Sequence, residues 1–329
     1  MPTKPPMVRA LIKLARPTQW GKGVFVLIGP AYALAQETAE LSASYIIAAL
    51  GVFTAFGLAS SGCYIVNDIA DRAHDANHPR KKHRPIASGV VPVGVARVYA
   101  LALFAAAGTL MIVLPLEDRW LWTTAIVVGY TLNVLVYSAL FKHRVILDVV
   151  SLSLGFVLRV LAGCAAVGAM PSTWLLNSTL FLAMFLAFGK RLGERRTMEA
   201  AGAAVETARG VQKAYSDDLL RMAVVMTAVG TLVTYAGYVE SQEGVYGPSI
   251  AAVASGAAPW AFNWLWLTMI PATYALLRCI VLLERGLYDD PTELAVRDRG
   301  VQLASIGFGA IAAVVVLLER GALPAADGM

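Results

Sequence analysis

Three aspartates at the end of a long apolar segment could bind a divalent cation. Asp68, Asp71 and Asp75 follow Asn67 at intervals of three and four residues. A helix turns by about 100° per residue, so Asp68 and Asp75 lie within about 20° of each other, Asp71 lies about 60° away, and one helical face carries all three. Carboxylate oxygens suit Mg²⁺, which commonly bridges protein and substrate phosphates. We therefore predict a magnesium site in which Asn67 orients the carboxylates.

A basic segment follows these acids and could bind the phosphates of the same substrate. It runs from His78 to Arg84 and includes Arg80, Lys81 and Lys82. Lysine and arginine pair strongly with phosphate oxygens. The alternative is a solvated acidic helix end beside a basic loop, which is the common arrangement in soluble proteins. The apolar segment that precedes the acids favours the functional interpretation, because it predicts a helix embedded in a membrane.

The composition predicts which elements position these residues. Of the 329 residues, 58% are hydrophobic and only 15% are charged, which lies outside the range of ordinary soluble domains. Nine apolar segments are long enough to cross a bilayer with ordinary variation in tilt. These segments are 20–36, 43–66, 94–115, 120–140, 145–169, 172–189, 219–240, 258–284 and 300–319. We predict an all-α integral membrane protein whose residues 1–329 form a single polytopic domain.

The distribution of basic residues predicts the orientation in the membrane. If the N-terminus is cytoplasmic, Arg159 and Arg278 lie inside predicted helices, only Arg119 and Arg320 lie outside, and the rest of the 27 Lys and Arg residues face the cytoplasm. We therefore expect a cell (inner) membrane protein with a cytoplasmic N-terminus and an external C-terminus. The net charge of +5 suits anionic headgroups and phosphorylated metabolites, so no nucleic-acid partner is required. The N-terminal residues lack the pattern of a removable signal peptide, and we expect none.

Further polar residues are candidates for substrate contacts. Arg159 follows Asp148 in the fifth predicted helix and lies roughly 16 Å deeper along its axis. An intramembrane charge needs a partner or a wet cavity, and we favour a functional role over a structural ion pair. Tyr137 shares a polar stripe with Asn133 on the fourth helix. Lys22, at the start of the first helix, could either bind a phosphate or extend to the membrane surface as an anchor.

The end of the sixth helix carries a second set of charged candidates. Lys190 and Arg191 lie where this helix meets water, level with the acidic residues if the bundle is compact. Lys190 and Glu194 could instead form a plain i,i+4 pair on the helix surface. We interpret Ser216 as a helix N-cap, and Asp289 and Asp290 likewise as capping residues without chemistry.

The acidic motif, at the end of the second of nine helices, resembles the first signature of the UbiA-type membrane prenyltransferases. Members of that superfamily have a second aspartate-rich motif after helix six, whereas this chain has Lys190, Arg191 and Glu194 there. This segment resembles the one found in a branch of polyprenyl-phosphate phosphoribosyltransferases. Segments 16–22, 78–87 and 296–303 resemble the same branch. The resemblance covers nearly the whole chain.

This resemblance implies a UbiA-like bundle with a cytoplasm-facing active-site cavity and a lateral opening for lipid. It implies transfer of 5-phosphoribosyl from 5-phosphoribosyl 1-pyrophosphate to a polyprenyl phosphate such as decaprenyl phosphate, for arabinofuranose donor and cell-envelope arabinan synthesis. Mg²⁺ would be the cofactor, and a homo-oligomer is compatible with the sequence. The metal and catalytic candidates are Asp68, Asp71 and Asp75. The substrate-binding candidates are Gln19, Lys22, Asn67, Arg84, Tyr137, Arg159, Lys190, Arg191 and Glu194.

Other functions stay open at this point. A prenyltransferase that joins a polyprenyl pyrophosphate to an aromatic acceptor would be expected to have an acidic pair after helix six, which this sequence lacks. A transporter of phosphorylated solutes could use Arg159, but neither an inverted repeat nor a midplane cluster of charges is evident. A lipid-binding scaffold would leave the three aspartates unexplained.

Overall fold

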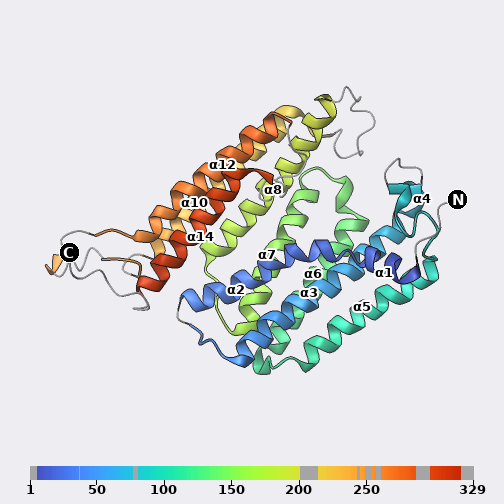
Figure 1. Cartoon of the computed structure of the whole chain (residues 1–329), viewed down its shortest axis with the longest axis horizontal. Coiled ribbons are helices and arrows are strands. Elements are labelled where there is room, and N and C mark those ends of the chain that lie inside the picture. The colour runs from blue at the N-terminus through green and yellow to red at the C-terminus, as the bar shows by residue number, and fades with distance from the viewer. Residues whose placement is uncertain are drawn as a thin grey trace. The chain divides into compact units, whose positions relative to one another are not determined.

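The chain is all-helical wherever its structure is described. A computed structural model describes residues 6–36, 38–76, 81–200, 214–242, 245–248, 254–256, 261–286 and 297–319. Every regular element within these ranges is an α-helix or a 3-10 helix (Figure 1). Eight of these helices are long and apolar enough to cross a membrane. The prediction of an all-α membrane protein is confirmed.

Most of the predicted apolar segments correspond to single long helices. The first group comprises α3 (Ala43–Ala70), α5 (Val93–Val113), α6 (Trp120–Ala139) and α7 (Leu147–Val167). The second comprises α8 (Thr173–Ala200), α10 (Asp217–Ser241), α12 (Met269–Glu284), which follows the 3-10 helix η6 (Trp264–Thr268), and α14 (Arg299–Glu319). Long apolar runs are the strongest signal in a membrane sequence, which explains this agreement.

The first predicted span, 20–36, differs from the others. It is divided between the 3-10 helix η1 (Pro17–Gly23) and the short α-helix α2 (Val24–Ala35), which contains Pro30. At 12 residues, α2 rises only about 18 Å, well short of a hydrocarbon core of about 30 Å. It is therefore not among the eight spanning candidates, and the predicted count of nine is not confirmed within the described residues.

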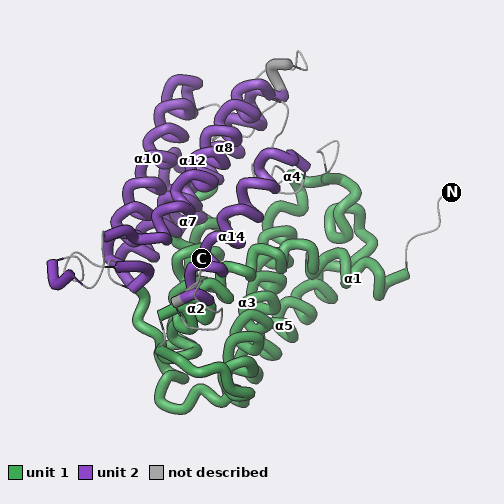
Figure 2. Tube along the Cα trace, turned by 60° about the vertical axis from the view of Figure 1, so that its left-hand side comes forward, with its two compact units in different colours: residues 1–142, 154–171 green, residues 143–153, 172–329 purple. Residues whose placement is uncertain are grey.

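The chain forms two compact units, coloured separately in Figure 2. Unit 1 comprises residues 1–142 and 154–171, and unit 2 comprises residues 143–153 and 172–329. Each unit has hydrophobic clusters of its own, with Phe56 and Ile65 among the buried residues of unit 1 and Phe185 and Leu283 among those of unit 2. The expectation of a single domain therefore stays a prediction.

In unit 1, α3 is the central helix and determines where the acidic residues lie. The Ser42 hydroxyl caps its N-terminus by accepting from the Tyr45 amide at 3.2 Å, which satisfies a free backbone donor of the first turn. Its main contacts are with α5 and α6. The helix ends at Asp71, whose amide donates to the Asn67 carbonyl at 2.9 Å, and α4 (Arg72–Ala76) follows directly. The acidic motif thus crosses a helix break.

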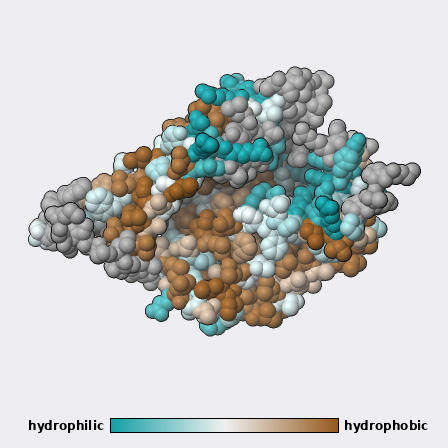
Figure 3. Space-filling view, in the orientation of Figure 1, coloured by the Kyte–Doolittle hydropathy of each residue, from teal (hydrophilic) through white to brown (hydrophobic). Residues whose placement is uncertain are grey.

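The outer surface of unit 1 matches a lipid environment. Along α5, Val98, Leu101 and Ile112 are exposed, and hydrophobic residues cover the corresponding region of Figure 3. Hydrophilic residues gather near α4 in the same view. An apolar helix surface that ends in a polar cap is the pattern expected where a spanning helix leaves the bilayer.

In unit 2, α8 and α10 form the most extensive helix pair, and α12 packs on α14. Ser216 begins α10 as predicted, because its hydroxyl accepts from the Leu219 amide at 3.1 Å. Asp298 caps α14 in a similar way by accepting from the Val301 amide at 2.9 Å. The predicted capping residues Asp289 and Asp290 lie outside the described residues.

Candidate active site

Two of the three aspartates share one arginine. Asp68, in the last turn of α3, and Asp75, in α4, are both almost fully buried. The Arg84 Nη1 donates to Asp68 Oδ1 at 3.1 Å and to Asp75 Oδ2 at 2.7 Å. Two carboxylates this close repel each other unless a cation lies between them. The structure therefore provides a position for positive charge between Asp68 and Asp75.

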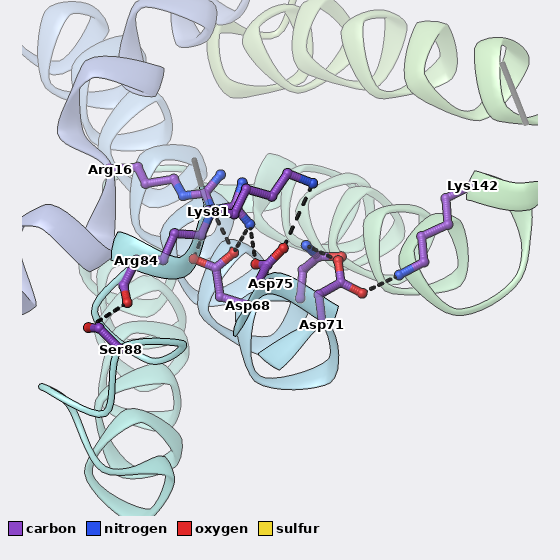
Figure 4. A network of polar contacts seen from close by, with 9 residues as sticks. Arg16, Asp68, Asp71, Asp75, Lys81, Arg84, Ser88 and Lys142 are labelled. Carbon is purple, nitrogen blue, oxygen red and sulfur yellow. Dashed lines mark hydrogen bonds and ion pairs between the residues drawn. The ribbon is translucent and has the colours of Figure 1, made fainter. Parts of the chain in front are cut away.

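Arg16 and Lys81 add further positive charge to the same two carboxylates. The Arg16 Nη2 lies 2.6 and 2.8 Å from the two oxygens of Asp68, and its guanidinium stands 5.0 Å from the centre of the Tyr64 ring. Arg16 adopts a positive φ of 51° at the end of α1 (Met7–Ala15), a rare conformation for a non-glycine residue. Lys81 Nζ lies 3.8 Å from Asp75 Oδ1. Figure 4 shows these cations gathered over Asp68 and Asp75.

Asp71 lies to one side and has different partners. It accepts from Lys142 Nζ at 2.7 Å and from the Asn67 amide at 3.1 Å, and Lys142 reaches it from the side opposite Arg16 (Figure 4). Burial alone raises the pKa of Asp71, but the hydrogen bonds from Lys142 and Asn67 outweigh it and hold the pKa below its ordinary value. Asp68 and Asp75 form a pair with Asp71 beside them, although the single helix that was predicted to carry all three is divided at Asp71 into α3 and α4.

The carboxylates fit a divalent cation in chemistry, although ion pairs hold them here. No group of three His, Cys, Asp or Glu side chains in the described residues is arranged to bind a metal. Asp68 and Asp75 nevertheless direct oxygens at one point, which Arg84 occupies. Asp75 Oδ1 is buried and accepts no hydrogen bond. A buried carboxylate oxygen that accepts no hydrogen bond, beside a cation position shared by two carboxylates, is a donor that suits Mg²⁺.

Gln19 and Lys22 lie together on η1, which Trp20 holds in place. The Trp20 Nε1 donates to the Ser61 hydroxyl at 3.1 Å, and the ring covers Gly57 so closely that a Cβ there would lie 2.7 Å from it. Gln19 and Lys22 are half-buried beside this anchor. Glycine is required at position 57 because only a residue without a side chain lets the indole approach α3.

Arg159 is buried in α7 with neutral partners. Its Nη2 donates to the Tyr130 hydroxyl at 2.7 Å and its Nη1 donates to the Gly155 carbonyl at 2.9 Å. The Tyr130 hydroxyl is also 2.8 Å from the Ser60 hydroxyl, and the guanidinium lies 4.5 Å from the centre of the Tyr130 ring. No carboxylate of the described residues pairs with Arg159. A buried guanidinium without an acidic partner retains the capacity to bind an anion.

In unit 2, Arg191 is held by a buried acid. Both Nε and Nη2 of Arg191 donate to Asp148 Oδ2, the former at 2.9 Å. The Tyr215 hydroxyl donates to Asp148 Oδ1 at 2.7 Å and accepts from the Ile146 amide at 2.8 Å. Burial and this hydrogen bond to Asp148 raise the pKa of Tyr215. Asp148 thus orients Arg191, which is also a candidate for contact with a substrate phosphate.

The remaining sequence candidates lie on α6 and α8. Lys190 and Glu194 are half-buried on α8, and Tyr137 is half-buried on α6. Sequence reasoning assigned no role to four residues of these networks, although it included Lys81 in the basic segment. They are Arg16, Lys142, Asp148 and Tyr215. Asp148 carried a usable signal, because a carboxylate in the first turn of a spanning segment requires a cationic partner.

Comparison with known proteins identifies the family of this chain. Residues 23–297 match the model of the UbiA prenyltransferase family. The chain belongs to this family. A relative from Mycolicibacterium smegmatis named decaprenyl-phosphate phosphoribosyltransferase is 33% identical over 318 residues, which cover 94% of this chain and 93% of the relative. A protein of the same name from Mycobacterium tuberculosis is 30% identical over 311 residues, covering 93% and 94% of the two chains.

Solved structures show the same family fold. A UbiA homolog from Archaeoglobus fulgidus, solved with GPP and Mg²⁺ bound, superposes with a TM-score of 0.57 at 17% sequence identity. The match covers 95% of this chain and 98% of the homolog. At this identity the likeness concerns the fold alone. The helical bundle of this UbiA family member is therefore that of a known class of integral membrane proteins.

Proposed function

We propose that this chain transfers a 5-phosphoribosyl group from 5-phosphoribosyl 1-pyrophosphate to a polyprenyl phosphate and releases pyrophosphate. The observation that carries the proposal is the similarity to relatives named decaprenyl-phosphate phosphoribosyltransferase over more than nine-tenths of both chains. The product would serve arabinofuranose donor and cell-envelope arabinan synthesis. The arrangement of charged side chains supports the same reaction.

The acidic site would bind the pyrophosphate end of the donor. Asp68 and Asp75, with Asp71 beside them, would hold Mg²⁺, which when bound neutralises charge on the departing pyrophosphate. Arg16 and Arg84 pair with these carboxylates in the present structure. With donor bound, both guanidinium groups would be free to pair with phosphate oxygens instead, which arginine does with two parallel hydrogen bonds.

Residues of α8 and of η1 would bind the remaining phosphates. Lys190 and Arg191 stand where other superfamily members are expected to have a second acidic motif, and cations there suit direct contact with phosphate. Asp148 fixes the direction of the Arg191 guanidinium. We propose that Gln19 and Lys22 contact the donor. Glu194 would orient Lys190 and Arg191 or a ribose hydroxyl.

The chemical step requires alignment more than acid or base catalysis. An oxygen of the lipid phosphate forms a bond to the anomeric carbon of the ribose while the bond from that carbon to the pyrophosphate oxygen breaks. The lipid phosphate is already anionic, so no group on the protein has to remove a proton. The protein residues would contribute by holding both phosphates in line and by stabilising the charge that moves to the leaving group.

The two substrates would reach the site by different routes. A polyprenyl tail loses about 0.8 kcal/mol for each methylene that leaves hydrocarbon, so it stays in the bilayer. We propose a lateral opening between helices for the lipid, with Arg159 and Tyr137 near the path of its phosphate. The charged donor would enter from the cytoplasm. We propose that the N-terminus and the active site lie on that side of the membrane.

The decisive experiment supplies alternative substrates to purified protein. With radiolabelled 5-phosphoribosyl 1-pyrophosphate, Mg²⁺ and polyprenyl phosphate, we expect a labelled lipid and free pyrophosphate. A parallel reaction contains a polyprenyl pyrophosphate and an aromatic acceptor such as 4-hydroxybenzoate. Product in the second reaction alone would replace our proposal with lipid-tail transfer, and product in neither would favour transport.

A further inference from the structure

The short helix α1, before the first apolar segment, has three different faces. Ala10 and Leu14 are buried against a cluster that includes Ile65 of α3. Val8 and Ile12 are exposed to 69% and 56%, although both are large and apolar. At about 100° per residue, these two side chains lie within about 40° of each other and are turned away from the buried face.

The third face of α1 is basic. Arg9 and Lys13 are exposed and lie within about 40° of each other, next to the exposed apolar face. Neither forms an ion pair with any residue that the structure describes. A helix with an exposed apolar face bordered by Lys and Arg is typical of segments that lie in the plane of a membrane interface.

Contacts with α3 determine the depth at which α1 lies. The Ser61 hydroxyl donates to the Ala15 carbonyl at 2.7 Å, and Arg16 directly after α1 pairs with Asp68 near the end of α3. Because α3 is a spanning helix, its polar end marks a membrane surface. These contacts hold α1 at that surface, where Val8 and Ile12 can reach acyl chains and Arg9 and Lys13 can reach headgroups.

We propose that α1 is an interfacial helix that binds the anionic headgroups of the bilayer through Arg9 and Lys13. Its exposed apolar face enters the outer part of the hydrocarbon layer. Because the chain passes from α1 directly into Arg16, the headgroup contact anchors the segment that supplies a cation to Asp68. This proposal does not depend on the reaction that the site catalyses.

Fluorescence quenching tests the depth of the apolar face. Val8→Cys carries a nitrobenzoxadiazole fluorophore in protein reconstituted into vesicles, and Lys82→Cys, an exposed residue of η2 (Lys81–His83), serves as the matched label. The three native cysteines are buried, and unmutated protein measures their background. We expect lipids brominated along their acyl chains to quench the label at position 8 at least about twofold more strongly than that at position 82. Equal quenching at both positions, with Ile12→Cys giving the same result, would overturn the proposal.

Energy transfer tests the preference for anionic headgroups. The label at position 8 donates to acceptor-labelled phosphatidylglycerol or, separately, to acceptor-labelled phosphatidylcholine in mixed vesicles. A basic residue at the membrane surface favours contact with an anionic lipid over a neutral lipid by a factor on the order of five. We expect the excess transfer to phosphatidylglycerol to fall at least about threefold in Arg9→Gln/Lys13→Gln.

The control Arg72→Gln/Lys82→Gln removes two exposed charges of the same unit and should leave the excess unchanged. No excess in the parent protein, or equal losses in both double variants, would contradict the proposal.

Discussion

At the residue scale, the central feature is the arginine nitrogen between two buried carboxylates. Arg84 Nη1 contacts both Asp68 and Asp75, and removal of either acid leaves the other with an excess of positive charge. A buried carboxylate pair without a cation is unstable, so the position between the two acids must hold either a side chain or a metal. This exchange of an arginine for a bound cation would make the site responsive to substrate.

We expect Asp68→Asn and Asp75→Asn each to lower turnover at least about a hundredfold, the scale of loss when one group that stabilises transition-state charge is removed. Asp71→Asn should cost less, because Asp71 has its own partners in Lys142 and Asn67. Initial rates with saturating substrates and Mg²⁺ provide the measurement. Asp118→Asn, the same change at an exposed turn, is the control. Near-normal turnover in either of the first two variants would remove these acids from the mechanism.

A second prediction at this scale concerns Arg159. If its guanidinium binds the lipid phosphate, Arg159→Lys keeps the charge but loses the forked geometry that binds an oxyanion. We expect the KM for polyprenyl phosphate to rise at least about tenfold, because a charge-assisted hydrogen bond contributes roughly 1.5 to 3 kcal/mol. The KM for the sugar donor should not change. Equal changes for both substrates would show that Arg159 has a structural role.

At the element scale, buried polar contacts tie helices to one another within unit 2. Asp148 at the start of α7, Arg191 on α8 and Tyr215 before α10 form one network. The three residues come from separate elements, so their contacts fix how those elements meet. Arg191 is therefore both a structural residue and a candidate phosphate ligand.

Substitutions can separate the structural role of Arg191 from phosphate binding, with Lys190 as the comparison. Arg191→Ala and Asp148→Asn should each lower the free energy of unfolding by about 3 to 5 kcal/mol, because each leaves a buried charge without its partner. Lys190→Ala, whose side chain is only half-buried, should cost less stability than either of these changes and raise the donor KM at least about tenfold. Thermal unfolding in detergent and donor kinetics measure the two effects, with Asp218→Asn, an exposed change, as the control. Full stability of Asp148→Asn would contradict the structural role.

The start of α14 has a pH-dependent cap. Arg278 donates to Asp298 at 3.0 Å, and this contact together with the Val301 amide lowers the pKa of Asp298. A carboxylate whose pKa is lower in the folded protein stabilises the fold above its ordinary pKa of about 3.9, and this stabilisation is lost as the pH falls through the folded value. We expect Asp298→Asn to be less stable than the parent at pH 7 and the difference to shrink at acidic pH. Melting curves across that range test this, and a constant difference would refute it.

At the scale of the whole molecule, the predicted orientation places most of the basic charge on the cytoplasmic side of the membrane. The predicted orientation puts Lys82 in the cytoplasm and Asp118 outside. In intact cells we expect a membrane-impermeant maleimide to label Asp118→Cys and to label Lys82→Cys only after permeabilisation. The reverse pattern would place the acidic site on the outer face and exclude a cytoplasmic sugar donor.

The sequence by itself determined the class of the protein and the position of the eight described helices that are long and apolar enough to cross a membrane. Long apolar runs must form helices in a bilayer because no water satisfies their backbone groups, so α3, α5 and α6 begin within a few residues of the predicted starts. Local capping was equally predictable, as Ser216 shows. Signals of this kind depend on neighbouring residues and need no knowledge of packing.

Only the tertiary structure decided which charges meet. Arg16 reaches Asp68 across 52 positions and Lys142 reaches Asp71 across 71, and no local pattern encodes such pairs. The helix break at Asp71 was also invisible to a periodicity that assumes an unbroken helix. Pairing between distant residues depends on how helices pack, and packing is a property of the whole set of apolar contacts. For that reason the residue types of the site and the closeness of Asp68 to Asp75 could be predicted, whereas the cations that pair with each carboxylate could not.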